Sequence, residues 1–208
     1  MTAADYVPPE ADISTLQQAA KACRGCELWE AATQVVFSAG NPHAKLMLVG
    51  EQPGDVEDQR GLPFVGPAGQ LLRKAVADAG IGVDDVYVTN AVKHFRFTLR
   101  GKRRIHATPQ IAHIRACRPW LEAEIATVQP ELTVLLGATA AKALLGSDFR
   151  ITRDRGRLIE SELLGRSLRL LATAHPSAVL RTQGEDRAAA YDQLVTDLRT
   201  AAVLVASE

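Results

Sequence analysis

Short apolar segments alternate with helical segments along most of this chain, and that order constrains the fold more than any other feature. Four segments have the length and composition of buried strands: residues 45–49, 86–89, 132–136 and 168–173. Helical patterns lie between and after them. This alternation predicts a parallel sheet with right-handed crossovers and helices on both faces. The fold class we expect is α/β, a three-layer α/β/α arrangement around a central four-stranded parallel sheet.

Sequence signals at helix ends place several of these helices. Ser14 to Gln17 reads as a capping box that opens a helix running toward Cys23. Residues 67–79 begin with proline and stop at Gly80, which predicts a helix between them. Thr108 and Pro109 resemble an N-cap and a first helical position, and Pro119 is expected to kink or restart that helix. Further helices are expected over residues 137–145 and 188–205.

Length and composition indicate one compact domain over residues 1–208. The chain has 208 residues, of which 47% are hydrophobic, enough for a sizeable core. No apolar run approaches the roughly 20 residues that a membrane span needs. The first ten residues lack the basic start and apolar core of a signal peptide. We therefore expect a cytoplasmic protein, without membrane contact, that acts as a monomer.

The net charge is zero, but the charges are unevenly distributed. No Asp or Glu occurs between Val86 and Leu121. The basic residues of this stretch are Lys93, Arg96, Arg100, Lys102, Arg103, Arg104, Arg115 and Arg118. A charge run is commonly only a solvated loop, but a locally basic face can also bind phosphates in a chain without net charge. Polar signals nearby favour the second interpretation.

Polar residues and glycines follow all four predicted strands. They occur as residues 50–55, as Asn90, as residues 137–139 and as residues 175–177. Ligands of parallel sheets bind beyond the carboxyl ends of the strands, so these residues predict a site at one sheet edge. Glu51 is a candidate for acid–base or electrostatic chemistry, or else a solvated turn residue. His175 is a candidate for the same site, although a single histidine is more often structural.

The three cysteines do not suggest disulfides, because their number is odd and the expected compartment is reducing. Cys23 and Cys26 have the spacing of two ligands to one metal or one cluster. Cys117 lies far from them in sequence, inside the basic stretch. His94 is the best candidate for a fourth ligand, since it follows a strand. Three thiolates and one imidazole suit zinc as well as an iron–sulfur cluster, and the spacing does not separate the two.

Taken together, these motifs resemble the iron–sulfur uracil-DNA glycosylases of family four, over nearly the whole chain. The resemblance is carried by Cys23-x-x-Cys26, residues 50–54, Gly61 to Gly66, Thr89-Asn90 with Val92-Lys93, Cys117 and His175-Pro176-Ser177. Three positions depart from the usual pattern. The family usually has Ala at Gln52 and a cysteine at His94, and it lacks an insertion like Arg100 to His106. All three departures point to the UdgX branch.

In the UdgX branch, the glycosylase becomes covalently joined to the DNA it has cut, through the histidine of a Lys-Arg-Arg-Ile-His motif. That motif stands here as Lys102 to His106. The resemblance therefore implies that His106 captures C1′ after uracil has left. It also implies a [4Fe–4S] cluster held by Cys23, Cys26, His94 and Cys117. The fold implied is that of the uracil-DNA glycosylases.

The resemblance implies roles for the remaining site residues and names the partner. The partner is uracil-containing DNA, single- or double-stranded, and the product is free uracil. Uracil would be flipped out of the helix and stacked on Phe64, with Asn90 reading its hydrogen-bonding edge. His175 would donate to uracil O2 and Glu51 would stabilise positive charge on the sugar. The other implied substrate contacts are Gln52 and Asp55, and the implied DNA contacts are Lys102, Arg103, Arg104, Ser177 and Arg181.

Two other functions stay open at this point. The same fold could act as a conventional glycosylase that releases abasic DNA and turns over many times. A non-catalytic, metal-stabilised nucleic-acid-binding module is a third possibility. Such a module would not need Glu51 and His175 at neighbouring strand ends.

Overall fold

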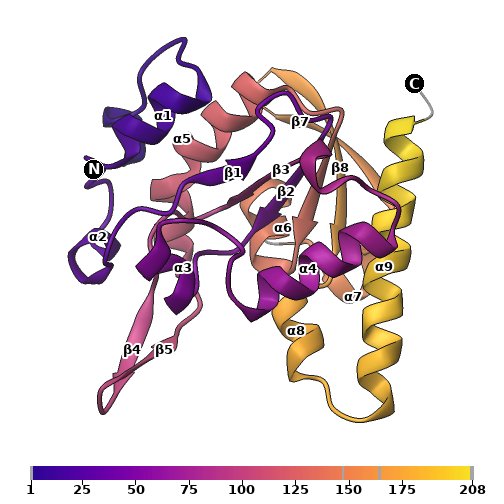
Figure 1. The fold of residues 1–208 in the computed structure, drawn as a ribbon. Helices are drawn as coiled ribbons and strands as arrows, with labels where there is room; N and C mark the ends of the chain where they lie inside the picture. The colour runs from indigo at the N-terminus through magenta and orange to yellow at the C-terminus, as the bar shows by residue number, and fades with distance from the viewer. Residues whose placement is uncertain (1, 147, 164, 207–208) are drawn as a thin grey trace.

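The computed structural model describes residues 2–146, 148–163 and 165–206. Its centre is a six-stranded sheet with the strand order β1-β3-β2-β6-β8-β7 (Figure 1). The strands are β1 (Ser38–Gly40), β2 (Leu46–Gly50), β3 (Val86–Asn90), β6 (Leu132–Leu136), β7 (Leu158–Leu163) and β8 (Arg166–Thr173). The pairs β3–β2, β2–β6 and β6–β8 are parallel, so the four central strands form the predicted parallel sheet.

The edge strands β1 and β7 are antiparallel to their neighbours and were not predicted. Strand β1 is only three residues long, too short to show a period. Strand β7 mixes Leu158 and Ile159 with Glu160 and Glu162, as an edge strand can because one side faces solvent. Strand β1 also depends on pairing with β3, which is distant in sequence, whereas β7 forms a hairpin with the next strand, β8.

Helices cover both faces of the sheet, which confirms the three-layer α/β/α arrangement. They are α1 (Ile13–Ala20), α2 (Leu28–Ala31), α3 (Asp55–Arg60), α4 (Pro67–Asp78), α5 (Ile111–Val128), α6 (Ala138–Leu145), α7 (Ile151–Asp154), α8 (Pro176–Arg181) and α9 (Glu185–Ala206). Short 3-10 turns lie at η1 (Ala3–Asp5) and η2 (Val83–Asp85). The helix predicted over residues 67–79 is confirmed as α4.

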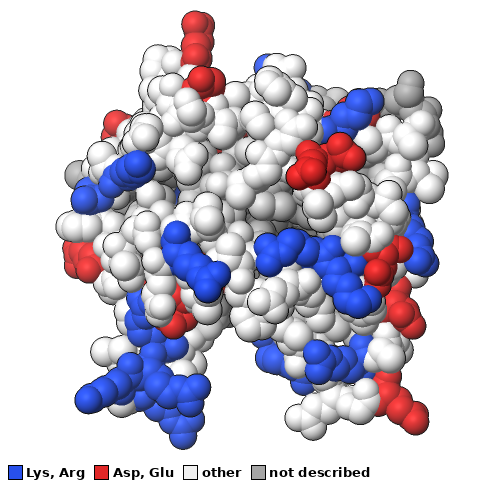
Figure 2. Space-filling view, viewed as in Figure 1, with Lys and Arg blue, Asp and Glu red and all other residues white. Residues whose placement is uncertain are grey.

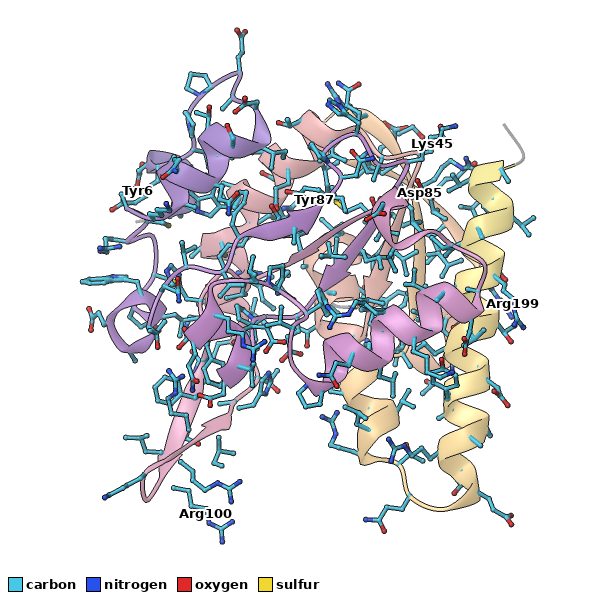
Figure 3. The ribbon with its side chains drawn as sticks, in the orientation of Figure 1. Tyr6, Lys45, Asp85, Tyr87, Arg100 and Arg199 are labelled. Atoms are coloured by element: carbon cyan, nitrogen blue, oxygen red, sulfur yellow. The ribbon has the colours of Figure 1, made fainter. Side chains whose placement is uncertain are left out.

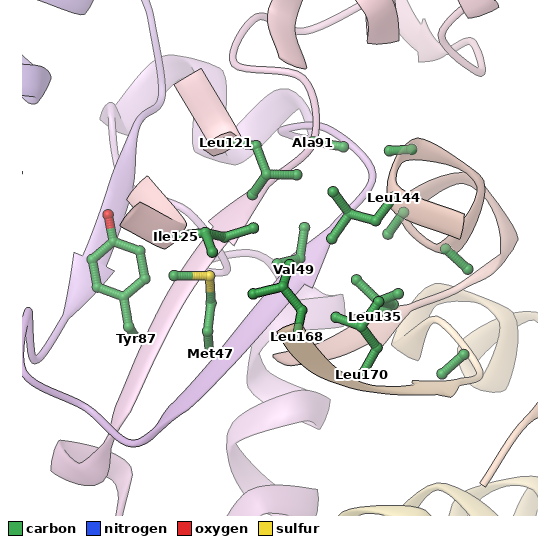
Figure 4. Packing of buried hydrophobic residues seen from close by; sticks show 14 of the residues in the cluster. Met47, Val49, Tyr87, Ala91, Leu121, Ile125, Leu135, Leu144, Leu168 and Leu170 are labelled. Carbon is green, nitrogen blue, oxygen red and sulfur yellow. The ribbon is translucent and has the colours of Figure 1, made fainter. Parts of the chain in front are cut away.

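Alternate residues of β2 divide the core between the two faces. Met47 and Val49 pack against α5 and α6, where Figure 4 shows them beside Leu121, Ile125 and Leu144. Leu46 and Leu48 face the other way and belong to a cluster with side chains of α4, α8 and α9. Because successive side chains of a strand point to opposite faces, a strand buried on both faces is apolar throughout.

Three predicted helix ends need correction. Helix α1 begins at Ile13, and its N-cap is Asp12, whose Oδ1 accepts from the Thr15 N–H at 2.7 Å; Ser14 lies inside the helix. Helix α5 begins at Ile111 rather than Pro109, because Gln110 forms the cap together with His113. A kink or a restart was expected at Pro119; the restart is wrong, since α5 runs through Pro119 to Val128.

A two-stranded hairpin projects from the body of the molecule where the sequence indicated only a basic loop (Figure 1). It consists of β4 (Phe97–Arg100) and β5 (Arg103–His106), with Phe97 paired to His106 and Arg100 to Arg103. The turn contains Gly101 at φ +60°, a conformation that favours glycine. The Lys-Arg-Arg-Ile-His motif is thus mostly strand, and His106 lies at the base of the hairpin.

No helix within the described residues is long and apolar enough to cross a membrane.

Candidate active site

A cleft of about 650 Å³ opens at the carboxyl ends of the four parallel strands. The structure brings these predicted site residues together as its lining: Glu51, Gln52, Phe64, Asn90, His106, His175, Ser177 and Arg181. Its lining also includes residues 137–139, which follow β6 as the strand order predicted. Figure 2 shows Lys and Arg side chains gathered over the β4–β5 hairpin, on one side of a notch in the outline of the molecule. His106, at the base of this basic hairpin, lines the cleft.

Phe64 and Asn90 meet at the end of β2, where Gly50 leaves room for both. A Cβ on Gly50 would lie 2.3 Å from Asn90 Oδ1 and 2.7 Å from Phe64 Cζ. Phe64 is buried and adopts a φ of +55°, a region that non-glycine residues rarely occupy. Asn90 is 2% exposed. An aromatic ring and an amide thus lie close enough together to contact the same planar ligand in the cleft.

Glu57 is a cleft residue that sequence reasoning missed. Its Oε1 accepts a 2.7 Å hydrogen bond from the Gly66 N–H, and its side chain is buried. This bond ties α3 to the loop that carries Phe64. The sequence offers no signal for it, because Glu57 is one of several acidic residues in α3.

The hydrogen bonds of His175 fix its tautomer. Its Nδ1 accepts from the Ser177 N–H at 3.1 Å and lies 2.8 Å from Ser177 Oγ. Burial lowers the pKa of His175 to about 4, with smaller effects from His106 and Arg181. The neutral ring therefore carries its proton on Nε2, the nitrogen left free to donate in the cleft.

Glu51 and His106 form a pair at the mouth of the cleft. His106 Nε2 lies 3.4 Å from Glu51 Oε1, which is long for a hydrogen bond but within ion-pair distance. The His106 side chain is 49% exposed and that of Glu51 is 18% exposed. An accessible imidazole with a carboxylate beside it can act as a nucleophile whose orientation the carboxylate controls.

The side-chain amide of Gln52 forms hydrogen bonds to both ends of the β4–β5 hairpin. Its Nε2 donates to the carbonyl oxygens of Arg96 at 3.0 Å and Ala107 at 3.1 Å, and its Oε1 accepts from the Arg96 N–H at 3.0 Å. All three bonds go to main-chain atoms that flank β4 and β5. The side chain expected to contact substrate is thus occupied in fixing the strand that ends at His106.

Asp55 and Arg104 depart from their expected roles. Arg104 Nε lies 2.5 Å from Asp55 Oδ1, and its Nη1 lies 2.6 Å from Oδ2 of the buried Asp58. The guanidinium also stacks over the rings of Phe95 and Phe97. Asp55 does not line the cleft, so a substrate contact of its side chain is not supported. Arg104 ties the hairpin to α3 and is not supported as a phosphate contact.

Other basic residues near the cleft stay accessible. Lys102 and Arg103 are exposed on the hairpin, and Figure 3 shows Arg100 at the far end of the hairpin, away from the body of the molecule. On the other side of the cleft, Arg181 Nη1 donates to Ser177 Oγ at 3.2 Å. These positions are compatible with the predicted DNA contacts of Lys102, Arg103, Ser177 and Arg181.

The three cysteines gather under the N-terminal segment. Cys23 and Cys117 are buried in one cluster with Trp120, and Cys26 packs against it. The Trp120 Nε1–H donates to Cys23 Sγ and the Lys93 N–H donates to Cys117 Sγ, each at 3.3 Å. Burial raises the pKa of the Cys117 thiol to about 12 and raises that of Cys26.

The expected ligands are three cysteine thiols and one histidine. Among the residues the structure describes, no three ligating side chains converge as they would around one metal ion. Two of the three thiols receive N–H donors, as the ligands of iron–sulfur clusters commonly do. His94 follows Lys93 in the sequence, and its side chain is buried. Burial lowers its pKa to about 4, which keeps a ring nitrogen free to coordinate.

Comparison with known proteins identifies the family. Residues 37–199 match the uracil DNA glycosylase superfamily. The type-4 uracil-DNA glycosylase of Archaeoglobus fulgidus is 36% identical over 162 residues, which cover 76% of this chain and 78% of that protein. The type-4 enzyme of Thermotoga maritima is 36% identical over 80% of this chain and 82% of its own. That of Pyrobaculum aerophilum is 34% identical over 82% of this chain and 85% of its own. This chain therefore belongs to the uracil-DNA glycosylase superfamily.

Proposed function

We propose that this protein excises flipped-out uracil from DNA and then joins itself through His106 to C1′ of the abasic site, as in the UdgX branch. The observation that carries the second part is the Glu51–His106 pair, which the hairpin holds at the mouth of the cleft. The family and the names of its relatives support the first part.

Base selection rests on Phe64 and Asn90. The phenyl ring stacks on the flipped base, and the Asn90 amide accepts from uracil N3–H and donates to O4. Cytosine presents the reverse pattern of donor and acceptor, so it leaves a buried amide unsatisfied. Such a mismatch commonly costs about 1–3 kcal/mol. Asn90→Ala is expected to reduce excision strongly while leaving DNA binding in place.

Bond cleavage rests on His175 and Glu51. The C1′–N1 bond breaks with both electrons passing to uracil, whose O2 gains negative charge. The neutral His175 donates Nε2–H to that oxygen, and loss of such a donor commonly costs about 3–4 kcal/mol. Glu51 lies where an anion stabilises the positive charge that develops on the sugar.

Capture of the sugar rests on His106. The ring nitrogen without a proton attacks C1′ and forms a C–N bond, and the proton on the other nitrogen then leaves toward Glu51. A tethered nucleophile can reach effective molarities of roughly 10⁵ M or more, well above the concentration of water. Capture therefore precedes hydrolysis, and the abasic DNA is not released.

Incubation with uracil-containing DNA, followed by a denaturing gel, tests this function. We expect a protein–DNA species that resists denaturation and forms only when uracil is present. His106→Ser is expected to abolish it and to release abasic DNA, since water can then enter. The exposed His43 provides the matched control, because His43→Ser removes a histidine remote from the cleft. A crosslinked band that survives in His106→Ser identifies another nucleophile and refutes the assignment.

We also propose that Cys23, Cys26, His94 and Cys117 hold a [4Fe–4S] cluster. When bound, it would clasp the N-terminal segment to α5 and serve a structural purpose. Iron and sulfide analysis, together with visible absorbance of the purified protein, tests this assignment. Zinc without iron in the same analysis would contradict it.

A further inference from the structure

A buried ion pair lies behind the base pocket, outside the residues that touch substrate. The side chains of Lys93 and Glu124 are 1% and 0% exposed, and Lys93 Nζ contacts Glu124 Oε2 directly. Lys93 follows β3, and Glu124 projects from α5. Their contacts therefore join the carboxyl end of β3 to the helix that covers it.

The Lys93 ammonium folds back over the end of β3. Its Nζ donates to the Asn90 carbonyl oxygen at 3.0 Å and to Thr89 Oγ1, and it lies 4.8 Å from the centroid of the Phe37 ring. Its own main-chain N–H donates to Cys117 Sγ. One residue thus contacts both the main chain of Asn90 and the cysteine cluster.

Glu124 completes the hold on β3. Its Oε1 lies 2.8 Å from both Tyr87 Oη and Thr89 Oγ1, and Figure 4 shows Tyr87 directed into the interior near Ile125 of α5. The carboxylate therefore contacts the hydroxyl groups of two β3 residues whose side chains point to the same face of the sheet. The last of these precedes Asn90 by one residue.

Stability alone does not account for this pair. Removing two charges from water has a large desolvation cost for each ion, and replacement of buried pairs by apolar residues of similar volume is often neutral or stabilising. A buried pair with all its partners in place does, however, allow only one arrangement of the chain around it. The arrangement fixed here is that of the residue whose amide reads the base.

We propose that Lys93 and Glu124 are positioning residues that hold Asn90 in the orientation needed to recognise uracil. The inference rests on the proposed excision of uracil. An amide that discriminates bases must keep its direction within roughly 10–20°, which requires support from the residues behind it. The Lys93–Asn90 bond supplies that support through the main chain.

The decisive variant replaces both charges at once. Lys93→Met with Glu124→Gln preserves volume, leaves no unpaired buried charge and lets residue 124 still accept from Tyr87 and Thr89. We expect the affinity for uracil-containing DNA to stay within about twofold, while single-turnover excision falls about tenfold or more. Tyr87→Phe is the matched control, since it removes one bond to the same carboxylate without touching Lys93. Unchanged excision in the double variant overturns the proposal.

A double-mutant cycle separates positioning from general damage to the fold. In the Asn90→Ala background, replacement of the pair should cause no further loss, because Asn90 is the residue through which it acts. An equal loss in both backgrounds would show that the pair acts elsewhere and would overturn the proposal. If the double variant does not fold, the same cycle is run with Thr89→Val, which removes a single hydroxyl from the network.

A readout independent of excision completes the test. The side-chain amide of Asn90 should give one sharp pair of ¹⁵N–¹H signals in the unaltered protein and broadened or doubled signals in the double variant. Identical spectra would overturn the proposal. Absence of excision by the unaltered protein would refute the proposed function instead, while the spectra still decide whether the pair orders Asn90.

Discussion

Gly50 ends β2 on the floor of the cleft, and the space it leaves is used by two side chains. Asn90 Oδ1 and Phe64 Cζ both lie closer to the position of a Cβ at residue 50 than the Cβ atoms of folded proteins approach other heavy atoms. The sequence indicated a turn with backbone close to a ligand. The structure adds that the close neighbours also include the two predicted base-binding residues, which no local pattern could show.

Gly50→Ala should therefore damage base recognition more than stability. The added methyl group must push aside the Asn90 amide or the Phe64 ring, and misplacement by about 1 Å can lower a rate about 100-fold. We expect single-turnover excision to fall by about that factor, with a smaller change in DNA affinity. Gly80→Ala is a control without steric conflict, since nothing lies within 4 Å of a Cβ there, although its φ of +80° costs some stability. Full excision by Gly50→Ala would refute the packing described here.

His175 predicts a pH dependence of folding stability. Its pKa is about 4 in the folded protein and about 6.5 when unfolded, so between these values the unfolded chain binds a proton that the folded chain does not. Its contribution to stability is complete above pH 6.5 and is lost progressively as the pH falls toward 4. Urea unfolding at pH 7.5 and pH 5 measures this.

The matched variants for that experiment are His175→Gln and His43→Gln. The loss of stability between pH 7.5 and pH 5 should be smaller in His175→Gln than in the unaltered protein. His43→Gln should leave the loss as it is, because that histidine is exposed. An undiminished loss in His175→Gln would mean that the ring is not held neutral by burial.

The β4–β5 hairpin is the element that distinguishes the site. Its basic residues were visible in the sequence, but the strand pairing, the Gln52 clamp and the Arg104 tether to α3 were not. The clamp and the tether depend on contacts between residues about 40 to 55 positions apart. The strand pairing is local, but a run of basic residues does not indicate it. The sequence therefore indicated which basic residues this segment contains. Only the structure distinguishes Arg104, which pairs with α3, from Lys102 and Arg103, which are exposed.

Gln52→Ala should separate the two chemical steps. Loss of three main-chain hydrogen bonds frees the ends of the hairpin and hence His106, while Phe64, Asn90 and His175 keep their own supports. We expect excision to stay within several-fold of normal and the crosslinked fraction to fall by roughly tenfold, with abasic DNA appearing instead. Denaturing gels with and without alkaline cleavage measure both products. Gln18→Ala, an exposed change in α1, is the control, and equal loss of both products in Gln52→Ala would contradict the clamp.

The tip of the hairpin should govern the salt dependence of DNA binding. Each phosphate contact contributes about 0.7–0.9 to the slope of log affinity against log salt. Lys102→Ala with Arg103→Ala should lower that slope by roughly 1.5 units. Lys45→Ala is the control, since Lys45 precedes β2 at the opposite edge of the sheet and pairs with Glu131. An unchanged slope in the double variant would show that the hairpin tip does not contact phosphates.

At the scale of the whole molecule, the sheet and the edge that carries the site followed from strand order. Local apolar patterns encode the four central strands, and topology then fixes where their carboxyl ends meet. The sequence did not indicate β1 or the Lys93–Glu124 pair, because each is defined by a partner distant in the chain. It did not indicate β7 or Glu57 either: their partners are near in sequence, but their charged residues resemble those of exposed segments. Paired cysteines, by contrast, were visible in the sequence, and the structure brings Cys117 to them.

The cysteine cluster should link the N-terminal segment to the rest of the fold, which Cys23→Ala tests. Cys23 is buried among Leu16 of α1 and Trp120 of α5. An iron–sulfur cluster bound there would therefore link two elements about 100 residues apart. Leu16→Ala is the matched control, because it removes apolar volume from the same buried group of side chains but removes no ligand. Such a change typically lowers the free energy of unfolding by about 2–5 kcal/mol. We expect both variants to unfold at lower temperature, and only Cys23→Ala to lose iron per folded molecule. Iron analysis and thermal unfolding on the same preparations decide this, because a purely apolar role for Cys23 predicts that both variants keep their iron.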